Sequence, residues 1–360
     1  MAGDVMHQSK SVFPAGDGPE QVAVDIWRIP LPLPFALRAV NTYLIADGTS
    51  GWTLIDSGLG LAADEAALRA GLAAAGASVA AITSLVLTHA HPDHVGLSGW
   101  VHAESGAPVY LLAGEDEALY RVWHAPEHRA MEAVSRMYAA NGLTAEQVTT
   151  TRAITERIRG VLRLPPRSAV RTLADGATVT LGGHQYAVIW TPGHSDYHMV
   201  LLRDDGILLA GDHVLPSITP NIGWYPQSRP NPLGDYFDSL ARVRDLPARL
   251  VLPGHGLPFT TLANRVDALR EHHEERSAQV RAIVAAAGPR GASAAQVATV
   301  LFGARLRTDD DRRFAVVEAL AHLEYLHAAA KLARRDDEAL VRFAVEPIPA
   351  LAGDASAGIR

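Results

Sequence analysis

Seven consecutive residues, 88–94, read Thr-His-Ala-His-Pro-Asp-His and place three imidazoles and one carboxylate within six positions. The largely apolar run 84–87 before them is typical of a buried strand, and Gly96 follows closely. Neutral imidazole and carboxylate are ligands that suit zinc, iron and manganese. The segment therefore predicts a metal site on a turn at the end of a strand. A histidine-rich surface turn is the alternative interpretation.

Three further candidate ligands lie far along the chain, each directly after a short apolar run and beside glycine: His194, Asp212 and His255. Glycine at such positions permits tight turns and close approach of the backbone. A single histidine after a strand is usually a turn residue. Four strand ends that each deliver histidine or aspartate instead indicate one common site.

The pattern His-x-His-x-Asp-His, followed by a distant His, a Gly-Asp and a Gly-His, resembles the metallo-β-lactamase superfamily across residues 20–262. The segment 55–58, Ile-Asp-Ser-Gly, matches the first short motif of that family. The resemblance implies an αββα sandwich with a binuclear metal site at one edge. It also implies the ligand roles: His89, His91 and His194 on one metal, Asp93, His94 and His255 on the second, Asp212 bridging both, and Asp56 supporting the ligand loops from behind.

The donor set also fits two metals on physical grounds. Seven ligands are too many for one tetrahedral zinc ion and suit two ions that share an aspartate. We expect hydrolysis in which a bridging hydroxide attacks an acyl carbon while one metal polarises the carbonyl and Asp93 and Asp212 orient the hydroxide. Two zinc ions are preferred, although iron or manganese also suits these ligands. The chain has no cysteine, unlike β-lactamases with a cysteine ligand.

The expected substrate is a small ester, thioester or lactone, a class that the resemblance to glyoxalase II-like thioester hydrolases supports by analogy. Two alternatives stay open because the same scaffold supports them. One is cleavage of phosphodiesters in single-stranded RNA, and the other is redox chemistry at a di-iron site.

Two regions are candidates for contacting the substrate. Residues 114–167 are rich in helix formers and predict a helical insertion between the two halves of the sandwich, with Met131 and Tyr138 on one apolar face. This insertion either caps the site or packs as an outer layer. The proline-rich segment 213–237 follows Asp212 directly, so it must lie near the metals. Its candidate contacts are His213, Trp224, Tyr225 and Arg229. An ordered surface loop is the alternative for this segment.

The resemblance implies an α+β fold, and length and composition fit a globular protein with one large and one small domain, since the 360 residues are 48% hydrophobic and 20% charged. We expect a flexible arm over 1–19, the catalytic sandwich over 20–262, a winged-helix domain over 263–346 and a tail over 347–360. The winged-helix domain is predicted from helices at about 264–287, 293–301 and 312–329, followed by a β-hairpin over 331–345. One branch of the superfamily carries a winged-helix domain at its C-terminus, and the chain resembles that branch.

Charge argues against several partners. The formal net charge is −7, and residues 263–346 hold 13 Lys/Arg and 13 Asp/Glu, whereas DNA-binding modules carry a clustered basic excess. Three acids, 309–311, precede the would-be recognition helix. We therefore expect no DNA partner, and expect this domain to pack on the catalytic domain or to form a homodimer. His272 and His273 are expected on a solvated helix surface.

From its apolar pattern, the sequence is expected to carry neither a signal peptide nor a membrane-spanning segment. Residues 1–19 lack the apolar core of a signal peptide, and no stretch approaches about 18 uninterrupted apolar residues. The simplest expectation is a cytoplasmic protein that does not contact a membrane.

Overall fold

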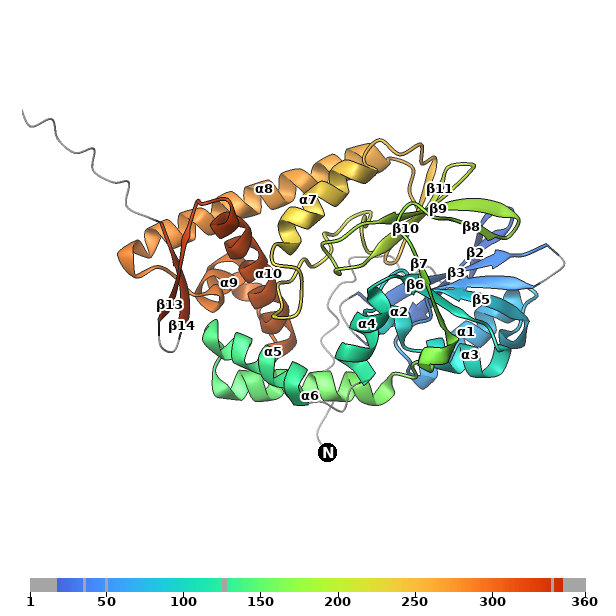
Figure 1. Ribbon diagram of the computed structural model, residues 1–360, viewed down its shortest axis with the longest axis horizontal. Coiled ribbons are helices and arrows are strands. Elements are labelled where there is room, and N and C mark those ends of the chain that lie inside the picture. The colour runs from blue at the N-terminus through green and yellow to red at the C-terminus, as the bar shows by residue number, and fades with distance from the viewer. Residues whose placement is uncertain (1–17, 35–36, 49–50, 125–127, 338–339, 346–360) are drawn as a thin grey trace, which may run out of the picture.

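The computed structural model describes residues 18–34, 37–48, 51–124, 128–337 and 340–345 (Figure 1). The predicted arm, apart from residues 18 and 19, and the predicted tail over 347–360 lie outside these residues. Two sheets pack face to face at one end of the molecule, and a helical unit with a small hairpin forms the other end. The α+β class predicted from sequence is therefore confirmed.

The first sheet has seven strands in sequence order within the described residues. The first four pair antiparallel and the last four pair parallel, with β4 shared by both parts. Parallel pairs need long crossover connections, and helices α1 (Ala62–Ala74) and α3 (Ser98–Ser105) belong to two of these. The strands are β1 (Glu20–Ala23), β2 (Ile26–Pro32), β3 (Ala39–Ala46), β4 (Trp52–Ile55), β5 (Ile82–Val86), β6 (Val109–Leu112) and β7 (Val170–Leu173).

The second sheet has five strands within the described residues, in the order β12-β11-β10-β9-β8. All neighbours are antiparallel except β11 and β12, whose connection contains helix α7 (Pro232–Val243). The strands are β8 (Thr178–Leu181), β9 (His184–Trp190), β10 (Met199–Arg203), β11 (Ile207–Gly211) and β12 (Leu250–Pro253).

Alternation along the strands produces the layers. Successive side chains of a strand point to opposite faces, so Leu54 joins the apolar core beneath α1 and α3 while Ile55 joins the core between the sheets. In the second sheet, Leu208 packs with α7 and α8 (Leu262–Ala286), and Leu209 faces the other sheet. Figure 1 shows α7 and α8 on one side of the two sheets and α1 and α3 on the other. This is the predicted αββα sandwich.

The helical insertion lies before the last strand of the first sheet and not, as predicted, between the two halves of the sandwich. It connects β6 to β7, which both belong to the first sheet, so it is an enlarged crossover within the first half of the sandwich. The strand β7 is short and mostly exposed, which hides it from periodicity. The insertion consists of α4 (Glu115–Leu119), η2 (Tyr120–His124), α5 (His128–Ala140), α6 (Ala145–Val161) and η3 (Arg167–Ala169).

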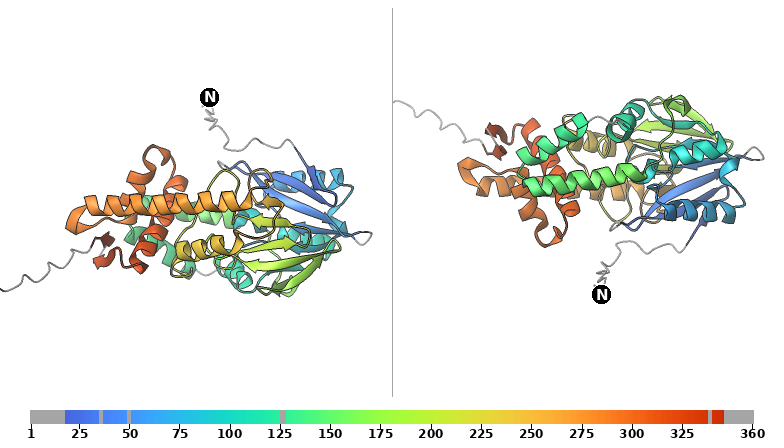
Figure 2. Two further views of the ribbon diagram at one scale, coloured as in Figure 1. Left: turned by 90° about the horizontal axis from the view of Figure 1, so that it is seen from above. Right: turned by 90° about the horizontal axis from the view of Figure 1, so that it is seen from below.

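The C-terminal domain follows the predicted order of three helices and a hairpin. Its helix α8 begins on the sandwich and ends in the C-terminal core, and Figure 2 shows this helix extending between the two ends of the molecule. The winged-helix interpretation itself stays a prediction. The other elements are η4 (Gly288–Arg290), α9 (Ala294–Phe302), η5 (Gly303–Arg305), α10 (Asp309–Ala328), β13 (Ala333–Asp337) and β14 (Leu340–Ala344).

Two expectations about this domain are wrong. The acids 309–311 form the first turn of α10, where Thr308 caps the helix and negative charge is favourable because of the helix dipole. His273 is fully buried, and its ring stacks on that of His322 with centroids 5.4 Å apart. The charged residues around His273 in the sequence suggested a solvent-exposed helix face, because local sequence does not show that α10 packs over His273.

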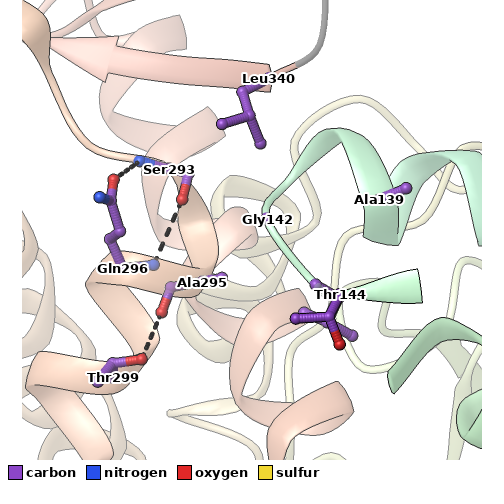
Figure 3. Close-up of a pocket in the computed structure, with 9 residues that line it drawn as sticks. Ala139, Gly142, Thr144, Ser293, Ala295, Gln296, Thr299 and Leu340 are labelled. Atoms are coloured by element: carbon purple, nitrogen blue, oxygen red, sulfur yellow. Dashed lines mark hydrogen bonds between the residues drawn. The ribbon is translucent and has the colours of Figure 1, made fainter. Parts of the chain in front are cut away.

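The insertion and the C-terminal domain contact each other directly. Tyr138 of α5 belongs to the C-terminal apolar core, and the N–H of Ala295 donates to the carbonyl of Asn141 at 3.0 Å. A hollow of about 410 Å³ lies beside this contact (Figure 3). Two of its hydroxyls, those of Thr144 and Ser293, accept backbone N–H groups as helix caps, so they serve local structure. In the part of the chain described, no helix is both long and apolar enough to cross a membrane.

Candidate metal centre

The seven predicted ligands all lie just beyond the carboxyl ends of four strands. Those after β5 sit on a tight turn and on the short helix α2 (Pro92–Val95), while single ligands follow β9, β11 and β12. Because these ends meet at one edge of the sandwich, loops distant in sequence can converge there. The ligands are His89, His91, Asp93 and His94 after β5, His194 after β9, Asp212 after β11 and His255 after β12.

The structure brings the donor atoms of all seven residues together. His91 Nδ1 lies 2.8 Å from His194 Nε2, and His194 Nε2 lies 3.4 Å from Asp212 Oδ2. That same Asp212 oxygen lies 3.3 Å from His255 Nε2, so Asp212 stands between the two predicted groups. Among the described residues, three sets have ligand atoms within 4.8 Å of one another: His89–His91–His194, His89–His94–Asp212 and Asp93–His94–His255.

The donor set fits divalent cations. His89 Nε2, His94 Nε2 and Asp212 Oδ1 are buried and have no hydrogen-bond partner of good geometry among the described residues, and His94 Nε2 faces Asp212 Oδ1 at 3.5 Å. A buried polar atom without a partner costs about 1–3 kcal/mol, and a bound cation would satisfy all three atoms. Gly254 keeps the space open, because a Cβ atom there would lie 2.2 Å from Asp212 Oδ1.

Hydrogen bonds donated by Nδ1–H fix four of the imidazole rings with Nε2 directed inward. A ring that donates Nδ1–H keeps its lone pair on Nε2, which is the form that binds metal. The hydroxyl of Thr88 already donates to Asp56, so it accepts from His89. The four acceptors are Thr88 Oγ1 for His89 (3.0 Å), Asp56 Oδ2 for His94 (2.8 Å), the Asn221 carbonyl for His194 (2.9 Å) and the Ala39 carbonyl for His255 (2.8 Å).

Asp56 supports the ligand loop from behind. It is buried, its Oδ1 accepts the N–H of Thr88 at 2.8 Å, and its Oδ2 accepts from both Thr88 and His94. Its φ of +58° is rare for a residue other than glycine. Such outliers cluster at functional sites where the surroundings enforce them.

Carboxylates place negative charge around His94 and His255 of the second predicted ligand group. Burial lowers the pKa of His94, but Asp212, Asp56 and Asp93 outweigh it and raise the pKa well above the usual value. Burial opposes the same effect at His255, where Asp212 and Asp93 raise the pKa to about 10. At His89, burial and the neighbouring imidazoles lower the pKa well below the usual value. The field at His94 and His255 attracts positive charge, as a cation site requires.

Sequence reasoning missed three residues that hold the ligand loops. His198 lies just before β10, accepts the N–H of Asp212 on Nε2 at 3.1 Å and bonds Thr191 through Nδ1. Glu115 and Trp123 of the insertion both bond the backbone of Ala90. Burial raises the pKa of Glu115 to about 7. An acidic residue in the first turn of a helix is common, so no sequence signal marks Glu115.

The predicted substrate contacts are dispersed. His213 is buried with its ring against Tyr236, centroids 5.3 Å apart, and Met131 is buried on α5. Arg229 forms an ion pair with Asp235 and lies over the ring of Trp190, 5.2 Å from its centroid.

The other three candidates meet at the C-terminal core. Trp224 and Tyr225 pack on the apolar cluster that includes Tyr138, at the junction of the insertion, the loop after β11 and helix α10. Contact of any of these six residues with a substrate stays a prediction.

Known proteins share both parts of this architecture. Residues 36–255 match the Metallo-beta-lactamase superfamily, and residues 280–346 match the family described as Metallo-beta-lactamase-like, C-terminal domain. The probable metallo-hydrolase YqjP of Bacillus subtilis (strain 168) is 28% identical over 314 residues, 84% of this chain and 92% of that protein. The atrochrysone carboxyl ACP thioesterase of Aspergillus fumigatus is 27% identical over 250 residues, 69% of this chain and 61% of that protein.

Solved structures agree over nearly the whole chain. The metallo-beta-lactamase family protein TTHA1429 from Thermus thermophilus superposes with a TM-score of 0.80 and 33% identity, covering 91% of this chain and 100% of that one. A beta-lactamase domain protein from Burkholderia ambifaria gives the same TM-score at 29% identity, covering 93% and 98%. The sandwich, the converging strand-end ligands and these matches lead to one conclusion: the chain belongs to the metallo-beta-lactamase superfamily.

Proposed function

We propose that this chain is a hydrolase that uses two divalent cations, zinc by preference, to cleave a small ester, thioester or lactone. The convergence of seven His and Asp side chains, three of whose buried donor atoms lack a hydrogen-bond partner of good geometry among the described residues, carries this proposal. When bound, the cations would supply Lewis-acid activation of water and of the acyl oxygen.

The residues of the chain have distinct tasks in this reaction. His89, His91 and His194 would hold one cation, and Asp93, His94 and His255 the other, with Asp212 shared. Asp93 is the more open of the two inner carboxylates, since its side chain is 18% exposed and that of Asp212 is 8% exposed. We therefore assign the carboxylate of Asp93 to carry a proton toward the leaving group, while Asp212 keeps the two groups in register.

Two observations favour an acyl substrate over RNA. One relative is named a thioesterase, and that protein resembles 69% of this chain. The C-terminal region 263–346 has equal numbers of acidic and basic residues and offers no basic excess for a phosphate backbone.

A substrate panel tests the proposal. Zinc-loaded protein is incubated with thioesters, esters, lactones and single-stranded RNA, next to the variant Asp212→Ala. We expect turnover in at least one acyl class and a loss on the order of a thousandfold in the variant, because the shared ligand is removed. Cleavage of RNA without acyl turnover, or full activity in Asp212→Ala, would contradict the proposal.

A further inference from the structure

One side-chain oxygen of the helical insertion contacts both segments that carry the three-histidine group, which consists of His89, His91 and His194. Glu115 Oε1 accepts the N–H of Ala90 at 2.6 Å and the hydroxyl of Ser195 at 2.9 Å. Ala90 lies between His89 and His91, and Ser195 follows His194 directly. Glu115 itself is 1% exposed, so water does not compete for these bonds.

A second side chain of the insertion, that of Trp123, bonds the other backbone polar group of Ala90. Trp123 Nε1 donates to the carbonyl of Ala90 at 2.7 Å. Both backbone polar groups of Ala90, its N–H and its C=O, are therefore fixed by the continuous segment of α4 and η2. A rotation of this backbone would reorient His91, so the insertion sets where that ring points.

The start of α4 is built against the other ligand loop. Gly114 has a φ of +99°, and a Cβ atom there would lie 2.5 Å from the ring of Tyr197, three residues after His194. Only glycine permits this approach, which brings Glu115 within reach of Ser195.

Stability alone gives a weak reason for a carboxylate at this position. Burying a carboxyl group is costly unless it is paired, and the bonds of Glu115 go to an N–H and a hydroxyl rather than to a cation. Its Oε2 is buried and has no hydrogen-bond partner of good geometry among the described residues, although the backbone of Tyr197 acts with Ala90 and Ser195 to lower the pKa of the carboxyl against the effect of burial. A residue that adds such a cost is explained better by what it positions.

We propose that Glu115 is a positioning residue that fixes His91 against His194, whose facing nitrogens lie 2.8 Å apart, and thereby sets the affinity of the three-histidine group for its cation. This inference rests on the metal site of the proposed function and does not depend on the substrate. It gives the insertion a role in assembling the site.

The test compares stepwise zinc affinities, measured by chelator competition, in the full chain. Glu115→Ala should bind one of the two zinc ions about 10- to 100-fold more weakly and the other within about threefold, since loss of a group that orients a metal ligand has effects of this size. Glu115→Gln should stay within about threefold of wild type for both ions, because an amide oxygen still accepts from Ala90 and Ser195. Glu324→Ala is the matched control, a buried carboxylate bonded to Arg334 in the C-terminal domain.

The melting temperature of the metal-free proteins separates positioning from folding. If the role is merely structural, Glu115→Ala melts at a lower temperature, as Glu324→Ala does, while both zinc affinities stay unchanged. That result would overturn the inference. Equal losses of zinc affinity in Glu115→Ala and Glu115→Gln would also overturn it. If Glu115→Ala does not fold, Ser195→Ala and Trp123→Phe decide. Each variant should weaken the binding of one zinc ion several-fold, and unchanged zinc affinities in both variants would overturn the inference. Failure of wild type itself to bind zinc would instead refute the proposed function.

Discussion

At the scale of single residues, the ligands depend on side chains behind them. Asp56 receives three hydrogen bonds and links the turn after β5 to His94. Its backbone lies in the left-handed region, which asparagine tolerates better than alanine does. The polar side chain and the unusual backbone therefore make separate contributions that two variants can distinguish.

We expect Asp56→Ala to weaken binding of the zinc ion at His94 by about 10- to 100-fold, because that imidazole loses its acceptor. Asp56→Asn keeps one oxygen acceptor and the favoured backbone conformation, so its loss should be smaller. Chelator competition on both variants measures the difference. Equal affinities in Asp56→Ala and wild type would show that the ring of His94 is fixed by other contacts.

At the scale of elements, helix α10 of the C-terminal domain reaches the metal site through one loop. The carbonyl of Asn221 accepts from His194 Nδ1, while Asn221 Nδ2 lies 3.3 Å from Glu318 Oε2 on α10. The N–H of Trp224 donates to the carbonyl of Val317 at 3.1 Å, which docks the same loop on that helix. The C-terminal domain thus supports the loop that bonds His194, one of the predicted metal ligands.

We expect Glu318→Ala to weaken one zinc affinity by several-fold, less than Glu115→Ala does, because the backbone bond between Trp224 and Val317 still holds the loop. Glu318→Gln, which keeps an oxygen for Asn221, serves as the control and should resemble wild type. Stepwise zinc titration measures the effect. An affinity unchanged in Glu318→Ala would mean that the loop positions His194 without help from α10.

Element boundaries show where sequence reasoning works and where it fails. Helix α1 spans Ala62–Ala74, and local signals predict it, because its sequence is rich in Ala and Leu and Gly76 follows its end. The exposed strand β7 was missed, and α10 begins three residues earlier than the predicted 312. The strand β7 forms by pairing with β6, a contact that local patterns do not contain, whereas the start of α10 carries a local capping signal, Thr308 with Asp311, that the prediction overlooked.

At the scale of the whole molecule, the sandwich was predicted from the family resemblance, and the strand-end motifs that carry this resemblance are local in the chain. The bonds that Glu115, Trp123 and Asn221 make around the ligand loops were not predictable. They join segments up to 97 residues apart in sequence through the packing of the insertion and the C-terminal domain. Supporting residues of this kind emerge only from the folded structure.

Metal removal tests how far the whole fold depends on the site. A ligand at a thousand times its dissociation constant stabilises the folded state by about 4 kcal/mol. For a chain of 360 residues this corresponds to about 5 °C in melting temperature for each ion, so chelation of two ions should lower the melting temperature by about 10 °C. Calorimetry with and without chelator measures the shift, and Asp212→Ala should show a smaller one. An identical melting temperature in both states of the wild type would contradict this expectation.

Every role proposed for these residues requires two cations held by side chains from four strand ends, with Asp212 shared between them. Elemental analysis of purified protein, after zinc loading and removal of excess metal, tests this most directly. We predict about two zinc ions per wild-type chain and about one or fewer in Asp212→Ala. An active wild-type chain free of metal, or an unchanged content of two in Asp212→Ala, would contradict the account.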